Sequence, residues 1–362
     1  MMERLWNRKP SIQAPRIVGR LALAPLLALA SPAIAASEES TSAPMYYLKT
    51  FGPKGDITAS LTWGLLAIAA GVSVLMSVLV IVAMFRNGRS SMATPGSPLP
   101  IAHPPGGHRW IYLGLALTTL VLIALVIWTM DVLAEIDEPA GEPAFTIEVT
   151  GQQWWWEARY VDPDDPSRSF VTANELHIPV GEPVRITLAS RDVIHSFWVP
   201  ALAGKTDVIP GQTNETWLQA DREGVYRGQC AEYCGLQHAH MALRIFADAP
   251  EAFQAWWDHQ LEPADEVPEG SELLAVGERQ FRLQCGACHA VRGTLAGGEA
   301  GPDLTHLMDR TTIASVTLPN TPGHLSGWIA DPQHQKPGTT MPNPDLSGPE
   351  LNAIRHYLET LD

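Results

Sequence analysis

Two long apolar runs near the N-terminus constrain the fold of this chain most strongly. Residues 57–85 and 111–130 contain no charged residue and consist mainly of leucine, valine, alanine and isoleucine. A helix needs about 20 apolar residues to cross the hydrocarbon core of a bilayer. Aromatic residues lie near the run ends, where interfacial belts form: Trp63, Trp110, Tyr112 and Trp128. We therefore expect a transmembrane hairpin within residues 37–140, with helices at about 57–85 and 110–133, rather than two core helices of a soluble protein.

The charges that flank these runs predict their orientation. The connecting loop carries Arg86, Arg89 and Arg109 without an acidic residue, whereas residues 37–56 mix both signs. By the positive-inside rule the loop faces the cytoplasm and both outer ends of the hairpin face outside. The N-terminus agrees, because basic residues, an apolar run and an Ala-x-Ala ending predict a signal peptide over residues 1–36.

Length and charge add two limits. The 362 residues exceed one ordinary core, so two or three domains are expected. Only 17% of the residues are charged, against about 25% in soluble domains, which agrees with membrane segments. A net charge of −15 argues against nucleic acid and favours a basic protein partner.

The rest of the chain divides into a β-rich part and a helical part. Between residues 141 and 262, short segments alternate apolar and polar residues and are separated by turn residues, a pattern typical of an all-β sandwich. Residues 253–261 predict a short closing helix. Residues 263–270 are acidic and proline-rich, which indicates a linker. Residues 271–362 predict a C-terminal all-α domain, with helices at 272–285, 324–330 and 350–361.

A set of sulfur and nitrogen ligands lies within the β-rich part. Its members are His195, Cys230, Cys234, His238 and Met241. Such soft ligands select copper, zinc or iron–sulfur clusters. The spacing predicts a dinuclear copper centre in which both thiolates bridge the metals and the main-chain oxygen of Glu232 is a further ligand. A mononuclear blue-copper site, which uses one cysteine, and a zinc site, which does not use methionine, are the alternatives.

The helical part carries a Cys-x-x-Cys-His sequence at Cys285, Cys288 and His289. This motif is the attachment signature of c-type haem, with a redox dithiol, a zinc half-site or disulfides as alternatives. His289 would bind the iron, and the carbonyl of Pro302 would hold its ring. Met341 is the expected sixth ligand, because a His/Met pair suits electron transfer. Its rivals are Met308, His306, His324 and His334.

Three consecutive tryptophans, Trp154, Trp155 and Trp156, follow Gln153 on a predicted strand. Such a run usually packs in a core. Because successive strand side chains point to opposite faces, we expect at least one of them to be exposed and to serve as an electron-transfer contact.

These motifs resemble one known family. The segments 151–156, 195–200, 204–211 and 228–234 are similar to cytochrome c oxidase subunit 2, and with residues 271–362 the chain resembles the caa-type variant with a fused cytochrome c domain. The resemblance implies a cupredoxin fold, a class I cytochrome c fold, a dinuclear CuA centre and covalent haem c. It implies that Trp154 and Trp155 face the donor and that the Glu232 side chain reaches a magnesium ion shared with the catalytic subunit. It also implies that Asp192 and Asp207 lie near that interface or the docking face.

The implied function is electron input to a haem–copper oxidase. Electrons from cytochrome c would pass through haem c and CuA to subunit 1, which would reduce oxygen, in a bacterial inner membrane with both redox domains on the periplasmic side. Alternatives are a relay for a nitric oxide or nitrous oxide reductase and a copper-delivery protein; a quinol oxidase subunit lacks the copper ligands. One departure is that residues 101–109 contain no acid at the mouth of the family's proton channel, where His103 and His108 are the only titratable residues besides Arg109.

Overall fold

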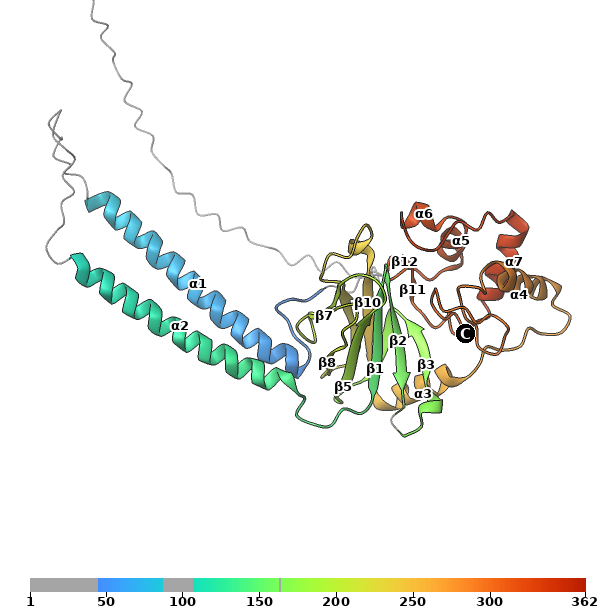
Figure 1. Ribbon diagram of the computed structural model, residues 1–362, viewed down its shortest axis with the longest axis horizontal. Helices are drawn as coiled ribbons and strands as arrows, with labels where there is room; N and C mark the ends of the chain where they lie inside the picture. Colours follow the sequence, from blue (N-terminus) through green and yellow to red (C-terminus); the bar gives the residue numbers. More distant parts are fainter. Residues whose placement is uncertain (1–44, 87–106, 163) are drawn as a thin grey trace, which may run out of the picture. The chain divides into compact units, whose positions relative to one another are not determined.

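The computed structural model describes residues 45–86, 107–162 and 164–362 (Figure 1). The expected signal peptide and the loop that contains His103 lie outside these residues. The described chain forms a helical hairpin, a β domain and a C-terminal helical domain.

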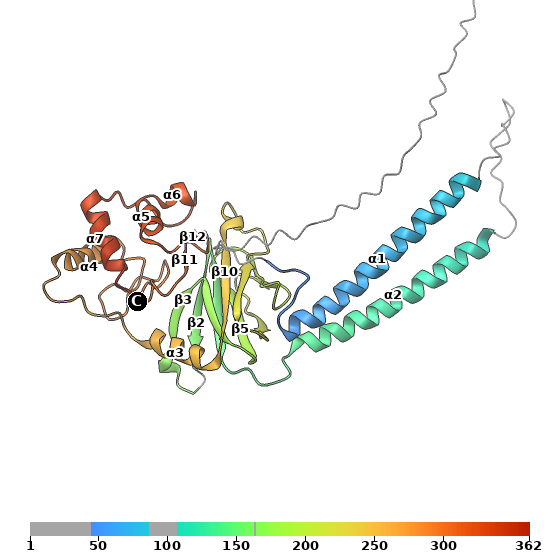
Figure 2. The same cartoon turned by 180° about the vertical axis from the view of Figure 1, so that it is seen from behind.

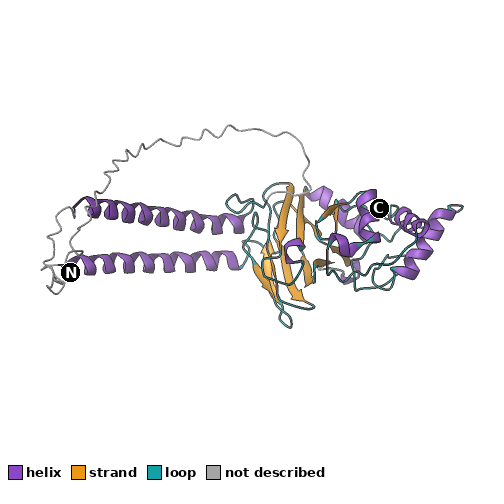
Figure 3. Ribbon diagram, turned by 90° about the horizontal axis from the view of Figure 1, so that it is seen from above, coloured by secondary structure: helices purple, strands orange, loops and turns teal. Residues whose placement is uncertain are grey.

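The two apolar runs form helices α1 (Pro53–Arg86) and α2 (Gly107–Asp137). Both are long and apolar enough to cross a membrane, and their apolar side chains are exposed rather than packed in a core. The helices lie side by side (Figure 3). Gly64 permits a close approach, because a Cβ there would lie 2.2 Å from the ring of Trp128.

The β domain contains two sheets, as the alternating pattern predicted. One sheet has the strand order β3-β2-β1-β5-β8 and the other β4-β10-β9, with β6 and β7 paired separately. The strand bounds are β1 (Thr146–Gln152), β2 (Trp155–Val161), β3 (Phe170–Ala173), β4 (Glu175–Pro179), β5 (Val184–Ser190), β6 (His195–Phe197), β7 (Thr206–Val208), β8 (Asn214–Leu218), β9 (Gly224–Gln229) and β10 (Ala242–Asp248). Buried side chains alternate along β1 and β5, so each strand contributes one face to the core.

The closing helix α3 (Pro250–Leu261) covers one end of this core. The ring of Phe145 stacks on Phe253 at 5.3 Å and meets the edge of Trp257 at 5.1 Å. The expected β-sandwich with a short closing helix is therefore confirmed.

The C-terminal domain is helical, with helices α4 (Glu272–Gln284), α5 (Pro322–Ala330), α6 (Pro332–Gln335) and α7 (Gly348–Leu358). A two-residue strand pair, β11 (Thr312–Ile313) and β12 (Leu318–Pro319), was not expected. Helices α4 and α7 cross closely because Gly277 has no side chain: a Cβ there would lie 2.2 Å from the carbonyl oxygen of Ala353. The domain has its own apolar core around Phe281, Ile354 and Tyr357.

The segment 263–270 is not a free spacer. Ala264 and Val267 pack against the core of the C-terminal domain. The loop that contains Thr311 and Ser315 bonds to the β domain, where the Ser315 hydroxyl donates to the carbonyl oxygen of Ala242 at 2.9 Å. Figure 2 shows the helices α4–α7 and the strands β11 and β12 of the C-terminal domain from behind. Sequence composition alone gave no sign of these contacts.

Candidate copper and haem centres

The predicted metal ligands come from the ends of three strands and one loop. His195 begins β6, Cys230 directly follows β9, and Met241 directly precedes β10. The loop between β9 and β10 supplies Cys234 and His238. Since β9 and β10 pair antiparallel, with Gln229 opposite Ala242, the loop returns to its starting point and brings its ligands together.

The five side chains and one carbonyl converge in the structure. The two cysteine sulfurs lie 3.7 Å apart, and the carbonyl oxygen of Glu232 lies 3.2 Å from Cys230 Sγ. His195 Nδ1 lies 3.9 Å from Cys230 Sγ, and His238 Nδ1 lies 3.5 Å from Cys234 Sγ. Met241 Sδ lies 3.8 Å from Cys234 Sγ. Ligands on one tetrahedral metal with bonds of about 2.0–2.3 Å lie about 3.3–3.8 Å apart. Three of these separations lie in that range, and those of 3.2 and 3.9 Å lie just outside it, so the set fits a soft metal centre.

Asp192 orients the His195 ring. Its carboxylate lies 2.8 Å from His195 Nε2 and also accepts from the main-chain N–H of Gln153 at 2.7 Å. The bond to Nε2 leaves Nδ1 facing Cys230, which is how metal-binding histidines are held in the correct tautomer. The resemblance placed Asp192 near an interface, and no sequence pattern predicted its contact with His195. Asp207 lies on β7 with an exposed side chain 3.7 Å from Lys205 Nζ.

The pKa values of the two thiols shift in opposite directions. Hydrogen bonds from Cys234 and His195 lower the pKa of Cys230 to about 4, although burial opposes the charge. The pKa of Cys234 is raised, because its hydrogen bond to Cys230 and its burial both favour the thiol. A thiolate is the form that binds metals, so the lowered pKa of Cys230 favours metal binding at its sulfur.

Two neighbouring groups point elsewhere. His240 is exposed and its Nδ1 lies 2.7 Å from the side-chain oxygen of Gln237. The Glu232 carboxylate is exposed and accepts from the main-chain N–H of Tyr233. No other described carboxylate or imidazole groups with Glu232 in a metal-binding arrangement. The described part of this chain therefore gives no support to a magnesium site there.

A cavity of about 240 Å³ in the C-terminal domain contains the haem motif. Its lining includes Cys285, Cys288, His289 and Met341, together with the apolar side chains of Phe281, Leu325, Trp328 and Ile354. Three residues of the β domain, Trp154, Trp155 and Asn174, also line it. An apolar cavity with both thiols and two axial-ligand candidates on its wall fits a covalently held haem.

His289 is held as an axial ligand requires. Its Nδ1 donates to the carbonyl oxygen of Pro302 at 2.8 Å, as the sequence suggested, which leaves Nε2 free. Burial lowers the pKa of His289 and favours the neutral ring. Gly301 fits the ring closely, because a Cβ there would lie 2.6 Å from His289 Cε1. Residue 301 must therefore be glycine for the ring to keep this position.

The rivals of Met341 lie away from the cavity. Both ring nitrogens of His306 contact main-chain oxygens, and Met308 packs against the apolar core. His324 is exposed and bonds to Thr321, and His334 is exposed on α6. Among the described methionines and histidines, only Met341 lines the cavity with His289. Met341 remains the proposed sixth ligand.

The prediction that at least one of the three consecutive tryptophans is exposed was wrong. Trp154 and Trp155 are each 8% exposed, and Trp156 is 0% exposed. Strand alternation does place Trp156 in the sandwich core, where its ring meets Phe197 edge-on. Trp154 and Trp155 are buried because residues of the C-terminal domain, including Ala314 and Lys336, surround the same cavity.

Comparisons with known proteins match the β domain and the C-terminal domain to two families. Residues 145–247 match the family described as the periplasmic domain of cytochrome c oxidase subunit II, and residues 274–362 match the cytochrome c family. The chain is 38% identical over 269 residues to cytochrome c oxidase subunit 2 of Alkalihalophilus pseudofirmus, which covers 71% of this chain and 75% of that protein. It is 30% identical over 274 residues to the subunit 2 of Bacillus sp. (strain PS3), again covering 71% and 75%.

A solved structure is also similar. The periplasmic domain of subunit II of cytochrome oxidase (CoxB) of Bradyrhizobium japonicum is 34% identical, covers 34% of this chain and 96% of that one, and gives a TM-score of 0.31. The identity with the Alkalihalophilus protein over three quarters of its length, together with the matched cytochrome c region, shows that the chain belongs to the cytochrome c oxidase subunit 2 family and carries a C-terminal cytochrome c domain.

Proposed function

We propose that this chain is the electron-input subunit of a haem–copper terminal oxidase. One observation carries the proposal: Trp154 belongs to both centres. Its indole N–H donates to the carbonyl oxygen of Cys234 at 3.0 Å, and its side chain lines the cavity that contains His289 and Met341. A single buried side chain thus joins a predicted copper ligand to the wall of the predicted haem cavity.

The cofactors supply one-electron redox chemistry, and the protein supplies spacing, orientation and exclusion of water. Cys285 and Cys288 would hold the haem covalently, with His289 and Met341 on its iron. The copper pair would be held by His195, Cys230, Cys234, His238, Met241 and the carbonyl of Glu232. Burial of both cysteines of the β domain and of His195 excludes solvent from these ligands.

Membership of the family supports a proposal for the partners and the location. We propose that subunit 1 and other subunits of the oxidase receive the electron and reduce oxygen. A cytochrome c or a similar protein would be the donor. The two apolar helices would anchor the chain in a bacterial inner membrane, with the β domain and cytochrome domain on the periplasmic side. A net charge of −15 favours a basic donor, whose approach should weaken as salt rises.

The buried tryptophans affect the route. Since Trp154 and Trp155 are covered in this chain, an external donor would reach the cytochrome domain first. This differs from the direct donor contact at these residues that the resemblance implied.

The test is to purify the full chain with its partners from native membranes and to follow oxygen uptake with reduced cytochrome c. Cys230→Ser should abolish the copper signal and oxygen uptake while the haem stays attached. His240→Ala is the matched control, because this neighbouring histidine faces away from the cluster, and it should keep both. A complex with intact copper and haem that consumes no oxygen would instead favour a nitrogen-oxide reductase. Labile copper without a partner would favour copper delivery.

A further inference from the structure

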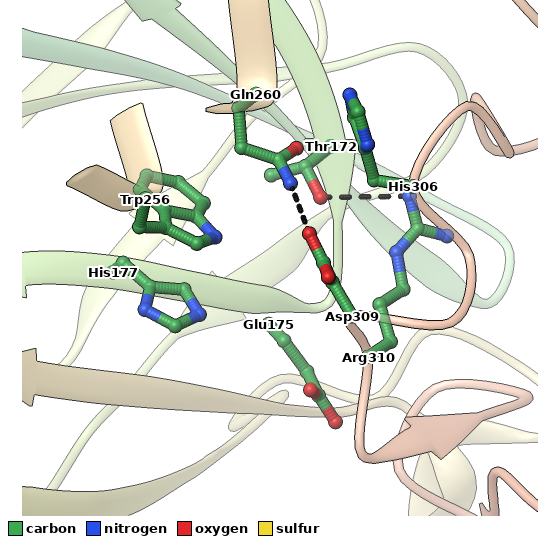
Figure 4. A pocket seen from close by; sticks show the side chains of 8 residues that line it. All are labelled: Thr172, Glu175, His177, Trp256, Gln260, His306, Asp309 and Arg310. Carbon is green, nitrogen blue, oxygen red and sulfur yellow. Dashed lines mark hydrogen bonds between the residues drawn. The ribbon is translucent and has the colours of Figure 1, made fainter. Parts of the chain in front are cut away.

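A second group of metal-binding side chains lies away from both centres. His259 on α3 lies beside His306 and Asp309 of the C-terminal domain, and their ligand atoms all lie within 4.8 Å of one another. Figure 4 shows two of these side chains, His306 and Asp309, with Gln260 of α3 bonded to Asp309. The group therefore joins the β domain to the cytochrome domain.

The distance between His259 and Asp309 matches that between two ligands of one metal ion better than that of a direct hydrogen bond. His259 Nε2 lies 3.3 Å from Asp309 Oδ2, whereas a charge-assisted N–H···O bond is about 2.7–2.9 Å long. Zinc bonds of about 2.0–2.1 Å to nitrogen and oxygen put tetrahedral ligands about 3.3–3.4 Å apart. The rings of His259 and His306 are 4.5 Å apart between centroids, so the second imidazole is within reach of the same ion.

His306 gives an independent reason for a cation. Its side chain is 4% exposed, with Nδ1 2.9 Å from the main-chain oxygen of Asp362 and Nε2 3.1 Å from that of Glu262. A neutral imidazole has one N–H, so it satisfies only one of these oxygens and turns a lone pair toward the other. A metal ion beside Nε2 would bind both this nitrogen and the main-chain oxygen of Glu262. The other ring nitrogen, Nδ1, would then donate its hydrogen to Asp362, and metal-binding histidines usually make such a hydrogen bond with their second nitrogen.

The surroundings support the same assignment. The side-chain amide of Gln260 donates to Asp309 Oδ2 at 2.9 Å and orients the carboxylate. The Glu262 carboxylate lies 3.8 Å from His259 Nδ1 and adds negative charge.

We propose that His259, His306 and Asp309 bind a zinc ion that fastens the cytochrome domain to the β domain. Two imidazoles and a carboxylate suit zinc and lack the sulfur ligands of the copper cluster. The carbonyl oxygen of Glu262 or a water completes the shell. This site is separate from the electron-transfer centres and does not depend on the identity of the donor.

The test uses the full chain loaded with copper and haem in detergent. After treatment with a chelator of weakly bound metals, zinc sulfate is titrated and the bound metal is counted by mass spectrometry. We expect one saturable zinc per chain. His259→Ala and Asp309→Asn should each weaken binding by at least about tenfold. These variants are preferred to changes at His306, whose burial makes misfolding a competing cause.

His356→Ala is the matched control. His356 has similar exposure to His259 and also lies near a carboxylate, Glu359 at 3.4 Å, but it belongs to no metal-binding group among the described residues. It should leave zinc binding unchanged. X-ray absorption at the zinc edge should show imidazole and oxygen ligands. Absence of saturable zinc, sulfur in the zinc shell, or equal affinity in His259→Ala and the unaltered chain would each overturn the proposal.

Discussion

The side-chain amine of Lys336 donates a hydrogen bond of 2.7 Å to the main-chain oxygen of Trp154, which joins the cytochrome domain to the β domain beside both candidate cofactor sites. Lys336 is 2% exposed and also lies 3.3 Å from the carbonyl oxygen of Ala314. No carboxylate among the described residues forms an ion pair with it. A buried amine with only carbonyl partners disfavours its own positive charge.

Replacing Lys336 should change how stability depends on pH. Burial lowers the pKa of Lys336 to about 7, whereas the pKa of a lysine in an unfolded chain is about 10.4. Between these values the unfolded chain binds a proton that the folded chain does not, so this residue makes folding more favourable as pH rises. We expect the Tm of the unaltered chain to rise relative to that of Lys336→Met between about pH 7 and pH 9.5 in thermal scans.

The control is Lys205→Met, since Lys205 is exposed and pairs only loosely with Asp207. Its Tm difference from the unaltered chain should stay constant over the same range. A constant difference for Lys336→Met as well would mean that the buried amine is not the source of the pH dependence.

Gly301→Ala should disturb the haem iron without releasing the haem. A Cβ at residue 301 would lie 2.6 Å from His289 Cε1 and 2.9 Å from Nδ1, so the ring must move away from the Pro302 carbonyl. The thioether bonds to Cys285 and Cys288 do not depend on that ring position. We expect covalent haem with an altered absorption spectrum and a shifted reduction potential.

Gly297→Ala is the matched control for this change. A Cβ at residue 297 meets nothing within 4 Å. The variant should therefore keep the spectrum and the potential of the unaltered chain. An unchanged spectrum in Gly301→Ala would contradict the assignment of His289 as an axial ligand.

Much of the fold could be predicted because its signals are local. The uncharged runs gave both long helices, although α1 begins at Pro53, earlier than residue 57, because hydropathy does not register the helical turn that contains Lys54 and Asp56. Ligand spacing predicted that the candidate copper ligands converge, since a hairpin between paired strands fixes where Cys230 and Met241 meet. The residues of the Cys-x-x-Cys-His motif likewise line a cavity, as a haem-attachment site requires.

The features that could not be predicted from the sequence depend on contacts between residues that are distant along the chain. The burial of Trp154 comes from the domain that contains Lys336, 182 positions further along the chain. The contact between Asp192 and His195 depends on a turn whose geometry no short pattern specifies. His259 and His306 likewise come together only because α3 and the cytochrome domain pack against each other.

Asp192→Asn should weaken copper binding without removing a ligand. The carboxylate holds His195 through Nε2 at 2.8 Å, and the loss of such outer contacts typically lowers metal affinity by about 10–100-fold. We expect a reduction in this range when copper is removed by a competing chelator. Asp207→Asn, at an exposed residue, is the control and should release copper as the unaltered chain does. Equal release from both variants would show that Asp192 does not support His195.

Glu175→Gln should loosen the loop that docks the cytochrome domain. The Glu175 carboxylate is 3% exposed and accepts hydrogen bonds from the main-chain N–H and hydroxyl of Thr311, each at 2.8 Å, and from the hydroxyl of Thr312. Hydrogen bonds to a charged group contribute about 1.5–3 kcal/mol each. In Glu175→Gln the side-chain NH2 group would replace one carboxylate oxygen, so it would face a threonine donor that then has no acceptor. We expect amide hydrogen exchange in residues 311–316 to accelerate by at least about tenfold, because tenfold corresponds to about 1.4 kcal/mol.

Glu215→Gln is the control, since this carboxylate is 55% exposed and pairs with Arg185 on the surface, where such a pair contributes about 0–1 kcal/mol. Exchange in residues 311–316 should not change in that variant. If Glu175→Gln also left exchange unchanged, the buried carboxylate would not be what holds the loop. The domain would then depend on the Lys336 and Ser315 contacts with the β domain. Faster exchange confined to this loop, with the core helices α4 and α7 unaffected, would instead show that docking and folding of the cytochrome domain are separable.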